Sequence, residues 1–165
     1  MPIPAFVRRL REQVGTAELW MPGVSGVILD DTGRLLLGRR TDTGQWAVVS
    51  GILEPGEQPA VALVREAMEE TGVEIEVVAL TVLHSGEPVE YPNGDRARYL
   101  DVCFWARAVG GEARVADDES TEVAWFARDA LPADLTPSSA ERIAHTLGHI
   151  AAHEAGTHPQ PYFVR

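Results

Sequence analysis

The sequence predicts an α/β or α+β fold in which a mixed β-sheet lies between helices. Two observations predict it. Short runs of β-forming residues alternate with turn signals, and two segments with helical character, 60–70 and 138–152, lie among and after them. The chain has 165 residues, of which 45% are hydrophobic, as in a globular protein with a real core. We therefore expect one domain over residues 1–165, with its core at about residues 20–150.

The first part of the chain predicts a helix and then three strands. Apolar residues recur every four positions over 3–14, and Gly15 ends this amphipathic helix. A turn at 21–23 precedes a strand at 24–29, an Asp/Gly hairpin turn at 30–33, a strand at 34–38 and a short strand at 46–50. The apolar stripe of the helix must be covered by the domain or by a second subunit.

The second part predicts longer strands and a final helix. Strands are expected at 74–84 and 98–109, with a polar loop at 85–97 between them. An acidic loop at 117–122 leads into a strand at 123–126, and the helix at 138–152 follows. Its histidines, His145, His149 and His153, are spaced for zinc but are better interpreted as a solvent-facing stripe. The Pro-rich tail at 156–165 is expected to be ordered only if it docks.

Composition excludes several classes of partner. The net charge of −11 argues against a nucleic-acid-binding surface, although an anionic nucleotide can bind where a metal ion supplies positive charge. No apolar run reaches the ~18 residues that span a membrane, and the N-terminus lacks a signal-peptide pattern. The single cysteine, Cys103, forms no internal disulfide and reads as a small core residue. We expect a cytoplasmic protein without membrane or nucleic-acid partners.

The predicted helix at 60–70 carries an unusually large number of acidic residues. Pro59 is tolerated in its first turn, and Gly72 is placed as its C-terminal cap. Glu66, Glu69 and Glu70 stand at i, i+3 and i+4, so three carboxylates share one face and repel one another. Either Arg65 and solvent offset this repulsion, or the carboxylates hold a divalent cation such as Mg²⁺ or Mn²⁺.

Residues 51–73, GILEPGEQPAVALVREAMEETGV, match the pattern Gly-x5-Glu-x7-Arg-Glu-(apolar)-x-Glu-Glu-x-Gly-(apolar) at every fixed position. The chain thereby resembles the Nudix hydrolase family, over about residues 20–150 in element order. The resemblance implies an α/β/α sandwich and Mg²⁺-dependent hydrolysis of a pyrophosphate bond. Proteins of this family are often homodimers, so it also predicts a homodimer. The sequence departs from the usual family pattern just before this box, where Val49-Ser50 stands in place of Pro-Gly.

The resemblance also implies roles for the residues of the box. Glu66, Glu69 and Glu70 would bind Mg²⁺, with a backbone carbonyl from Gly51. Glu57 would bind the metal through water or orient Arg65, which is better interpreted as an internal partner of the glutamates. The general base would be a box glutamate or a carboxylate from the later acidic loop, which offers Glu119 and Glu122. Glu122 leads into a strand from which related proteins often send a carboxylate to the metal, so it is the catalytic candidate of the loop, and Glu119 is a candidate metal ligand. The alternative for these two residues is a solvated acidic turn.

Substrate contacts are less sharply indicated. Arg39 and Arg40 could bind phosphate or form a solvated strand end. The aromatic residues Trp46, Tyr91 and Tyr99 could stack on a base, although such residues more often lie in a core. Asp95, Arg96 and Arg98 could fix a ribose or a phosphate.

The expected reaction is cleavage of a nucleoside diphosphate linked to another moiety, such as ADP-ribose, with release of a nucleoside monophosphate. The alternatives are a house-cleaning nucleoside triphosphate pyrophosphohydrolase and a catalytically idle ligand-sensing module.

Overall fold

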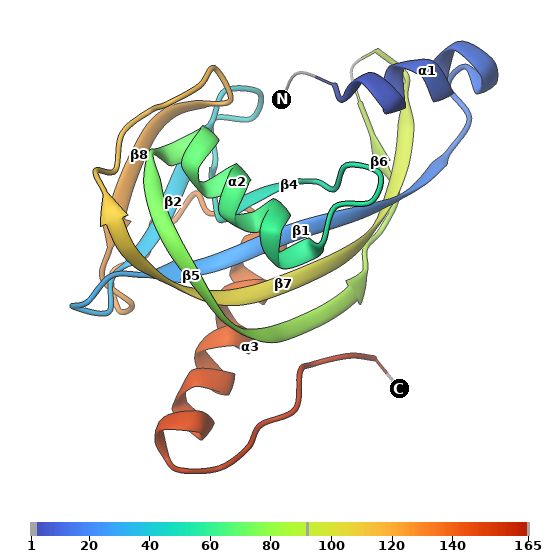
Figure 1. The fold of residues 1–165 in the computed structure, drawn as a ribbon. Helices are drawn as coiled ribbons and strands as arrows, with labels where there is room; N and C mark the ends of the chain where they lie inside the picture. Colours follow the sequence, from blue (N-terminus) through green and yellow to red (C-terminus); the bar gives the residue numbers. More distant parts are fainter. Residues whose placement is uncertain (1–2, 92, 165) are drawn as a thin grey trace.

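The computed structural model describes residues 3–91 and 93–164 and confirms the predicted fold class, with a mixed sheet lying between helices (Figure 1). The elements in chain order are α1 (Ala5–Val14), β1 (Leu19–Leu29), β2 (Leu35–Arg40), β3 (Trp46–Ala47), β4 (Val49–Ile52), α2 (Pro59–Thr71), β5 (Val73–Ser85), β6 (Val89–Glu90), β7 (Arg96–Gly111), β8 (Ser120–Phe126) and α3 (Pro137–Glu154).

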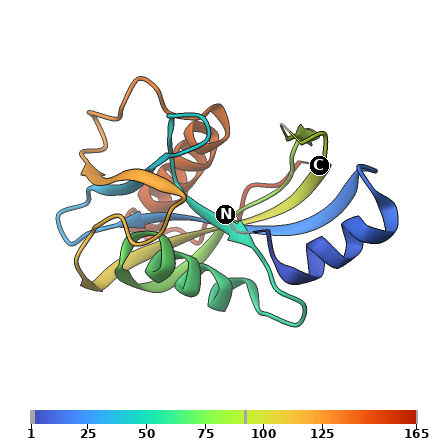
Figure 2. The ribbon, with the colours of Figure 1, turned by 90° about the horizontal axis from the view of Figure 1, so that it is seen from above.

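The sheet runs in the order β3-β2-β1-β7-β5, with β4 paired to β1, β8 to β2 and β6 to β7. The β1–β7 pair is parallel and the remaining pairs are antiparallel, so the sheet is mixed. Side chains alternate between the two faces along each strand, and each face therefore needs its own cover. Figure 2 shows α2 on one face and α3 on the other.

Two apolar clusters follow from this alternation. Val24 and Ile28 of β1 pack under Leu63 of α2. Val27 and Leu29, which flank Ile28, point the other way and pack in a cluster with Ile143 of α3. Helix α2 lies very close to β1, because a Cβ on Gly26 would stand 2.7 Å from a methyl carbon of Leu63. The first cluster fixes α2, which carries the acidic residues, against one face of the sheet, and the second fixes α3 against the other.

Strand β1 begins earlier than the sequence predicts. The expected turn at 21–23 is instead part of the strand, with Pro22 opposite Leu100 of β7. Proline lacks the N–H that a central strand needs, but Pro22 lies before the segment 23–26 that also pairs with β4. Pro22 is therefore tolerated because of where β4 pairs with β1. This long-range pairing cannot be predicted from the turn-forming residues at 21–23.

Strands β2 and β4 separate from each other on one side of β1. Strand β4 pairs with β1 from Gly23↔Ile52 to Gly26↔Val49. The β1–β2 pairing in the described structure is the single pair Leu29↔Leu35, beside the hairpin turn. Beyond it β2 turns away and pairs with β8 through residues 35–40. A cleft therefore opens between β2 with β8 on one side and β4 on the other.

The C-terminal tail docks on the edge strand β5. The backbone N–H of Tyr162 donates to the carbonyl of Thr81 at 2.8 Å, and the N–H of Leu83 donates to the carbonyl of Tyr162 at 2.9 Å. The Tyr162 ring stacks on His145 of α3, with centroids 3.7 Å apart. His153 meets Trp105 edge-on. Two of the three predicted solvent-facing histidines therefore contact rings of the same molecule.

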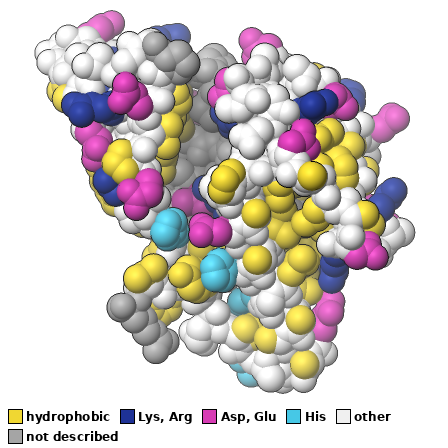
Figure 3. Space-filling view, turned by 180° about the vertical axis from the view of Figure 1, so that it is seen from behind, with side chains coloured by type: hydrophobic (Ala, Val, Ile, Leu, Met, Phe, Trp, Pro, Cys, Tyr) yellow, Lys and Arg dark blue, Asp and Glu magenta, His cyan; other side chains and the backbone are white. Residues whose placement is uncertain are grey.

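Helix α1 is covered in part. Val7 is buried against Met21 and Ala97, whereas Leu10 and Val14 keep 43% and 44% of their surfaces exposed. In the part of the chain that the structure describes, none of the helices combines the length and the apolar character needed to cross a membrane. Basic side chains are scattered over the face shown in Figure 3 and form no stripe there.

Candidate active site

Helix α2 turns its two central glutamates into the protein. The helix begins at Pro59 and ends at Gly72, whose φ of 68° is a left-handed cap that glycine adopts without strain. Glu66 and Glu70 lie one turn apart and are only 6% and 8% exposed. The side chain of Glu69 is 57% exposed. Of the three acids, two are thus withdrawn from solvent, which is costly for a charged carboxylate.

The Glu66 carboxylate lies directly against the backbone of Gly51 in β4. A Cβ built on Gly51 would collide with the carboxylate carbon and with one of its oxygens. Glycine is therefore required here to let the acid of α2 approach the strand, and its carbonyl shares the same small region. The structure gives a steric reason for the glycine that opens the acidic motif.

Arg65 ties three glutamates together. Its Nε and Nη2 donate to the two carboxylate oxygens of Glu57, both at 2.9 Å. Its Nη1 lies 2.9 Å from Glu66 Oε1 and 3.1 Å from Glu69 Oε2. The hydrogen bond from Arg65 lowers the pKa of Glu57. The predicted internal role of Arg65 is thus visible in its contacts, and its fork geometry holds Glu57 at the entrance of the helix.

This network does not neutralise the acids fully. Burial raises the pKa of Glu66 to about 7 in spite of Arg65. The pKa of Glu70 is raised well above its ordinary value, first by burial and then by the charge of Glu119. Crowded, desolvated carboxylates of this kind are stabilised by a cation, and their hard oxygen atoms suit Mg²⁺ or Mn²⁺.

The donor chemistry therefore fits a divalent ion. Among residues 3–91 and 93–164, no three acidic, histidine or cysteine side chains already converge closely enough to hold one. Glu66 and Glu70, with the half-exposed Glu69 beside them, are the side chains of α2 that would turn toward it.

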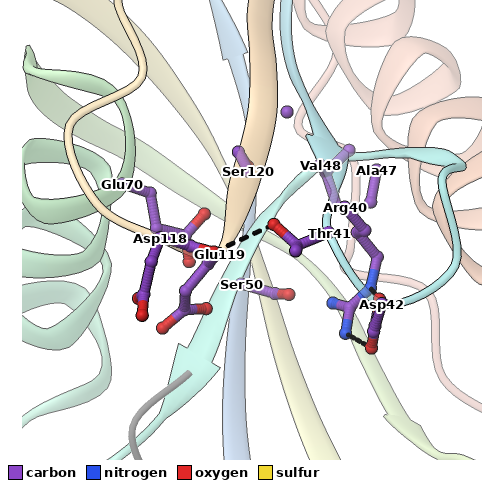
Figure 4. Close-up of a pocket in the computed structure, with 11 residues that line it drawn as sticks. Arg40, Thr41, Asp42, Ala47, Val48, Ser50, Glu70, Asp118, Glu119 and Ser120 are labelled. Carbon is purple, nitrogen blue, oxygen red and sulfur yellow. Dashed lines mark hydrogen bonds and ion pairs between the residues drawn. The ribbon is translucent and has the colours of Figure 1, made fainter.

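A pocket of about 330 Å³ opens beside Glu70, in the cleft between β2 with β8 and β4. Figure 4 shows its two walls: Glu70, Asp118 and Glu119 on one side, Arg40 and Asp42 on the other, with Ser50 between them. The lining residues are Gly38, Arg40, Thr41, Asp42, Ala47, Val48, Ser50, Glu70, Asp118, Glu119 and Ser120. An acidic wall opposite a guanidinium suits a substrate with adjacent phosphoryl groups, one facing a metal ion and one facing the arginine.

The acidic loop is fastened to the opposite wall by Thr41. The Thr41 N–H donates to the carbonyl of Glu119 at 2.8 Å, and its hydroxyl donates to the carbonyl of Asp118 at 2.9 Å. Burial raises the pKa of the Glu119 carboxyl, whose charge in turn acts on Glu70. The structure thus brings Glu119 to the box glutamates.

Glu122 is placed differently. Strand β8 begins at Ser120, so Glu122 lies inside the strand and not in the predicted loop, directly across from Arg39 of β2. Arg39 Nη1 donates to Glu122 Oε1 at 2.8 Å and also lies 3.6 Å from Asp134. Neither Arg39 nor Glu122 lines the pocket. Of the two predicted arginines, Arg40 therefore belongs to the pocket, and Arg39 is engaged elsewhere.

The predicted aromatic and polar substrate residues also lie outside the pocket. Trp46 is 8% exposed and packs edge-on against Phe126, with ring centroids 4.8 Å apart, so it belongs to the core under α3. The hydroxyl groups of Tyr91 and Tyr99 are hydrogen-bonded to each other at 2.7 Å. Both belong to the β6–β7 hairpin region beside α1, and the three predicted polar residues, Asp95, Arg96 and Arg98, lie in the same region.

Asp95 and Arg98 of that hairpin region make local contacts. Asp95 lies 3.5 Å from Nε of Arg11 in α1. Arg98 donates to the carbonyl of Gly86 at 3.1 Å and lies 3.4 Å from Glu18. These contacts join the hairpin to α1 and to the start of β1.

Sequence reasoning assigned a site role only to Arg40, Glu70 and Glu119 among the lining residues, and it missed Asp42, Asp118 and Ser50 among others. Asp42 and Asp118 were parts of loops with no assigned role. Ser50 was noted as a departure from the usual glycine, and its hydroxyl now lines the pocket without a hydrogen bond to any described residue. An Asp two residues beyond Arg40 was a usable signal for an ion pair, whereas the position of Asp118 depends on the pairing of β8 with β2.

Comparisons with known proteins agree with this geometry. The model of the NUDIX domain matches residues 19–146. A MutT-like protein of Streptomyces ambofaciens is 34% identical over 142 residues, which are 84% of this chain and 86% of that protein. The ADP-ribose pyrophosphatase of Methanocaldococcus jannaschii is 33% identical over 112 residues, 66% of this chain and 63% of that protein. Human 8-oxo-dGDP phosphatase NUDT18 is 32% identical over 130 residues, 75% of this chain but 36% of that longer protein.

Solved structures give the same answer. A NUDIX hydrolase from Nitrosomonas europaea superposes with a TM-score of 0.65 at 26% identity, covering 88% of this chain and 98% of that one. The MutT NUDIX hydrolase of Burkholderia pseudomallei has a TM-score of 0.62 at 29% identity, covering 77% of this chain and 98% of that one. The family model spans most of the chain, and the acidic motif lies at the pocket that the fold creates. The chain therefore belongs to the Nudix domain family of hydrolases.

Proposed function

We propose that this protein is a Mg²⁺-dependent hydrolase that cleaves the pyrophosphate bond of a nucleoside diphosphate linked to another moiety, as in ADP-ribose, and releases a nucleoside monophosphate. The observation that carries the proposal is a pair of buried acids one helical turn apart: Glu66 lies against the backbone of Gly51, and Glu70 lines a pocket that has Arg40 on its far wall. Mn²⁺ would serve the same oxygen donors.

The residues divide the work of hydrolysis. When bound, the metal would neutralise phosphoryl charge and activate water. Glu66, Glu69 and Glu70 would hold it, with Glu57 and the Gly51 carbonyl nearby. Arg65 would keep Glu57 and Glu66 in place through its contacts of 2.9 Å. Arg40 would bind a phosphoryl oxygen from the other wall.

A carboxylate must also accept a proton from the attacking water. Glu119 fits this role better than Glu122, because Glu119 lines the pocket and acts electrostatically on Glu70. Glu122 is engaged by Arg39 at 2.8 Å. A group whose pKa is raised by burial is better matched to proton transfer near neutral pH than an ordinary carboxylate. A box glutamate remains the alternative base, which the variants below separate from Glu119.

A second candidate reaction is the hydrolysis of oxidised or non-standard nucleotides. It is favoured by the name of one relative, the human 8-oxo-dGDP phosphatase, whereas the archaeal relative is named an ADP-ribose pyrophosphatase. A catalytically idle sensor is the third alternative, and the complete set of box glutamates argues against it. A substrate panel that includes ADP-ribose, 8-oxo-dGDP and 8-oxo-dGTP, with and without Mg²⁺, separates the three.

The test measures release of monophosphate and of inorganic phosphate from that panel. Glu69→Gln and Glu70→Gln should each lower kcat by at least about a hundredfold without loss of fold, because each removes a metal-binding charge. Glu119→Gln should lower kcat and remove the acidic limb of the pH–rate profile if Glu119 is the base. Glu76→Gln, an exposed residue of β5, is the charge-matched control. Full activity of the Glu70 variant would refute the proposed metal site.

Three accompanying features stay predictions. They are a homodimer, tested by light scattering at micromolar concentration, a cytoplasmic location, and the absence of a nucleic-acid partner.

A further inference from the structure

Arg40 and Asp42 form a bidentate ion pair on the rim of the pocket. Arg40 ends β2, and Asp42 lies two residues further along the loop to β3. Arg40 Nε donates to Asp42 Oδ1 at 2.9 Å, and Nη2 donates to Oδ2 at 2.6 Å. The contact therefore uses one edge of the planar guanidinium, and the plane of the group is fixed by it.

The other edge of the guanidinium stays available. A guanidinium has five N–H donors, and Asp42 takes those of Nε and one on Nη2. Among the described residues none accepts from the hydrogens of Nη1 or from the second hydrogen of Nη2, and we call these donors the free fork. In Figure 4 Asp42 lies on the outer side of Arg40, away from Glu70 and Glu119. The pKa of Arg40 is raised first by the hydrogen bond to Asp42, with further contributions from the charges of Glu70 and Glu119 across the pocket.

The loop that carries Asp42 is itself held in place. The N–H of Arg40 donates to the carbonyl of Gln45, and the N–H of Gly44 donates to the carbonyl of Arg40, both at 2.9 Å. Thr41 donates to the acidic loop through both its N–H and its hydroxyl. Asp42 thus stands at a fixed place relative to both walls of the pocket and can hold the guanidinium in one orientation.

We propose that Asp42 is a positioning residue, which presents the free fork of Arg40 to a phosphoryl group of the substrate. The inference rests on the proposed function and deepens it. It assigns one phosphoryl group of a diphosphate to Arg40, opposite the acidic wall that would hold the metal ion. Because the pair is already formed, the arginine loses little side-chain freedom on binding substrate. The opposite expectation is that Asp42 competes with the phosphate for Arg40 and weakens binding.

The two expectations differ in sign for Asp42→Asn. Removal of a negative charge by itself favours an anionic substrate, so mere electrostatics predicts a lower KM. Positioning predicts a KM that rises roughly 5- to 20-fold with kcat little changed, because a charge-assisted bidentate contact becomes a weak one. Asp31→Asn is the matched control: Asp31 is exposed at the hairpin turn, and its side chain makes no hydrogen bond or ion pair with the described residues. That turn lies at the opposite end of β2 from Arg40.

A double-variant cycle tests whether Asp42 acts through Arg40. Arg40→Lys keeps the charge but loses the fork, so it should raise KM by a similar factor. In the Arg40→Lys background, Asp42→Asn should raise KM no further. A lowered or unchanged KM for Asp42→Asn alone, or full additivity of the two changes, would overturn the proposal.

The positioning role of Asp42 and the proposed hydrolase function can be refuted separately. If the wild-type protein turned over nothing in the panel, the hydrolase proposal would fail. Calorimetric titration with AMP, in the presence of Mg²⁺, would still test the positioning role. Weaker binding by Asp42→Asn than by wild type and Asp31→Asn supports it. Equal or tighter binding by Asp42→Asn, or no binding of AMP by the wild type, overturns it.

Discussion

The buried acid Glu66 should make the metal-free protein less stable at neutral pH than its uncharged variant. Glu66 is 6% exposed and contacts Gly51 and Arg65. Glu66→Gln is nearly isosteric and still accepts a hydrogen bond from Arg65. The substitution therefore removes the charge while it keeps the shape of the site, and it isolates the free energy of holding that charge in the fold.

The size of the effect follows from the pKa. Burial raises the pKa of Glu66 from its ordinary 4.5 to about 7. Each pKa unit corresponds to about 1.4 kcal/mol, so the ionised side chain costs the folded state about 3 kcal/mol. A raised pKa in the folded state means that the associated stability is fully present below pH 4.5 and is lost as the pH rises through about 7.

The assay is unfolding by heat or urea, in EDTA, between pH 4.5 and pH 8. Wild type and Glu66→Gln should be about equally stable at the acidic end. At pH 8 the variant should be more stable by about 3 kcal/mol, or roughly 6–12 °C in Tm for a chain of this size. Saturating Mg²⁺ should reverse the order, because it stabilises by mass action only the protein that binds it.

Two results would refute this reasoning. One is that, in EDTA, the Glu66→Gln variant is less stable than wild type and that this deficit in stability is larger at pH 8 than at pH 5. The other is Mg²⁺ stabilisation that is equal in the two proteins. The first would show that Glu66 is ionised at no cost, and the second that Glu66 holds no metal.

Three further variants test neighbouring contacts. Gly51→Ala places a methyl group where the Glu66 carboxylate lies, so kcat/KM should fall at least about tenfold while the far-UV circular dichroism is unchanged; normal activity would show that Glu66 can move freely. Arg65→Lys cannot make the bidentate contact with Glu57, and calorimetry should show Mg²⁺ affinity reduced several-fold, a result that unchanged affinity contradicts. Tyr162→Ala removes the ring stacked on His145, so Tm should fall by roughly 2–4 °C, the effect of about 1 kcal/mol; an unchanged Tm would mean that the tail docks without stabilising the fold.

The acidic helix could be predicted from sequence because its determinants are local. Helical spacing alone brings Glu66 and Glu70 to one face, and Pro59 and Gly72 mark the ends of α2. Periodicity does not say which way that face points. The burial of Glu66 and Glu70 depends on Leu63, on the same helix, packing over Gly26 of β1.

The later acidic segment shows where local reasoning stops. Glu119 and Glu122 lie three residues apart, and the sequence offers both as candidates for the general base. The pairing of β8 with β2 starts at Ser120, and this register sends Glu122 to Arg39 while Glu119 stays at the pocket. Trp46 lies in the core for a related reason, because β3 and β8 both pair with β2 and its ring packs against that of Phe126. Both outcomes follow from long-range strand pairing.

The same pairing explains why the site lies where it does. Strand β1 holds β4 through residues 23–26 and meets β2 only at its end among the described residues, so the two neighbours diverge and leave a cleft. Strand β4 brings Gly51 to one side of that cleft, and β2 ends at Arg40 on the other. The acidic motif of residues 51–73 would by itself supply only carboxylates on a helix. The divergence of β2 from β4 adds a guanidinium across a pocket of about 330 Å³, and this second wall is what can distinguish a diphosphate from a lone metal-bound anion.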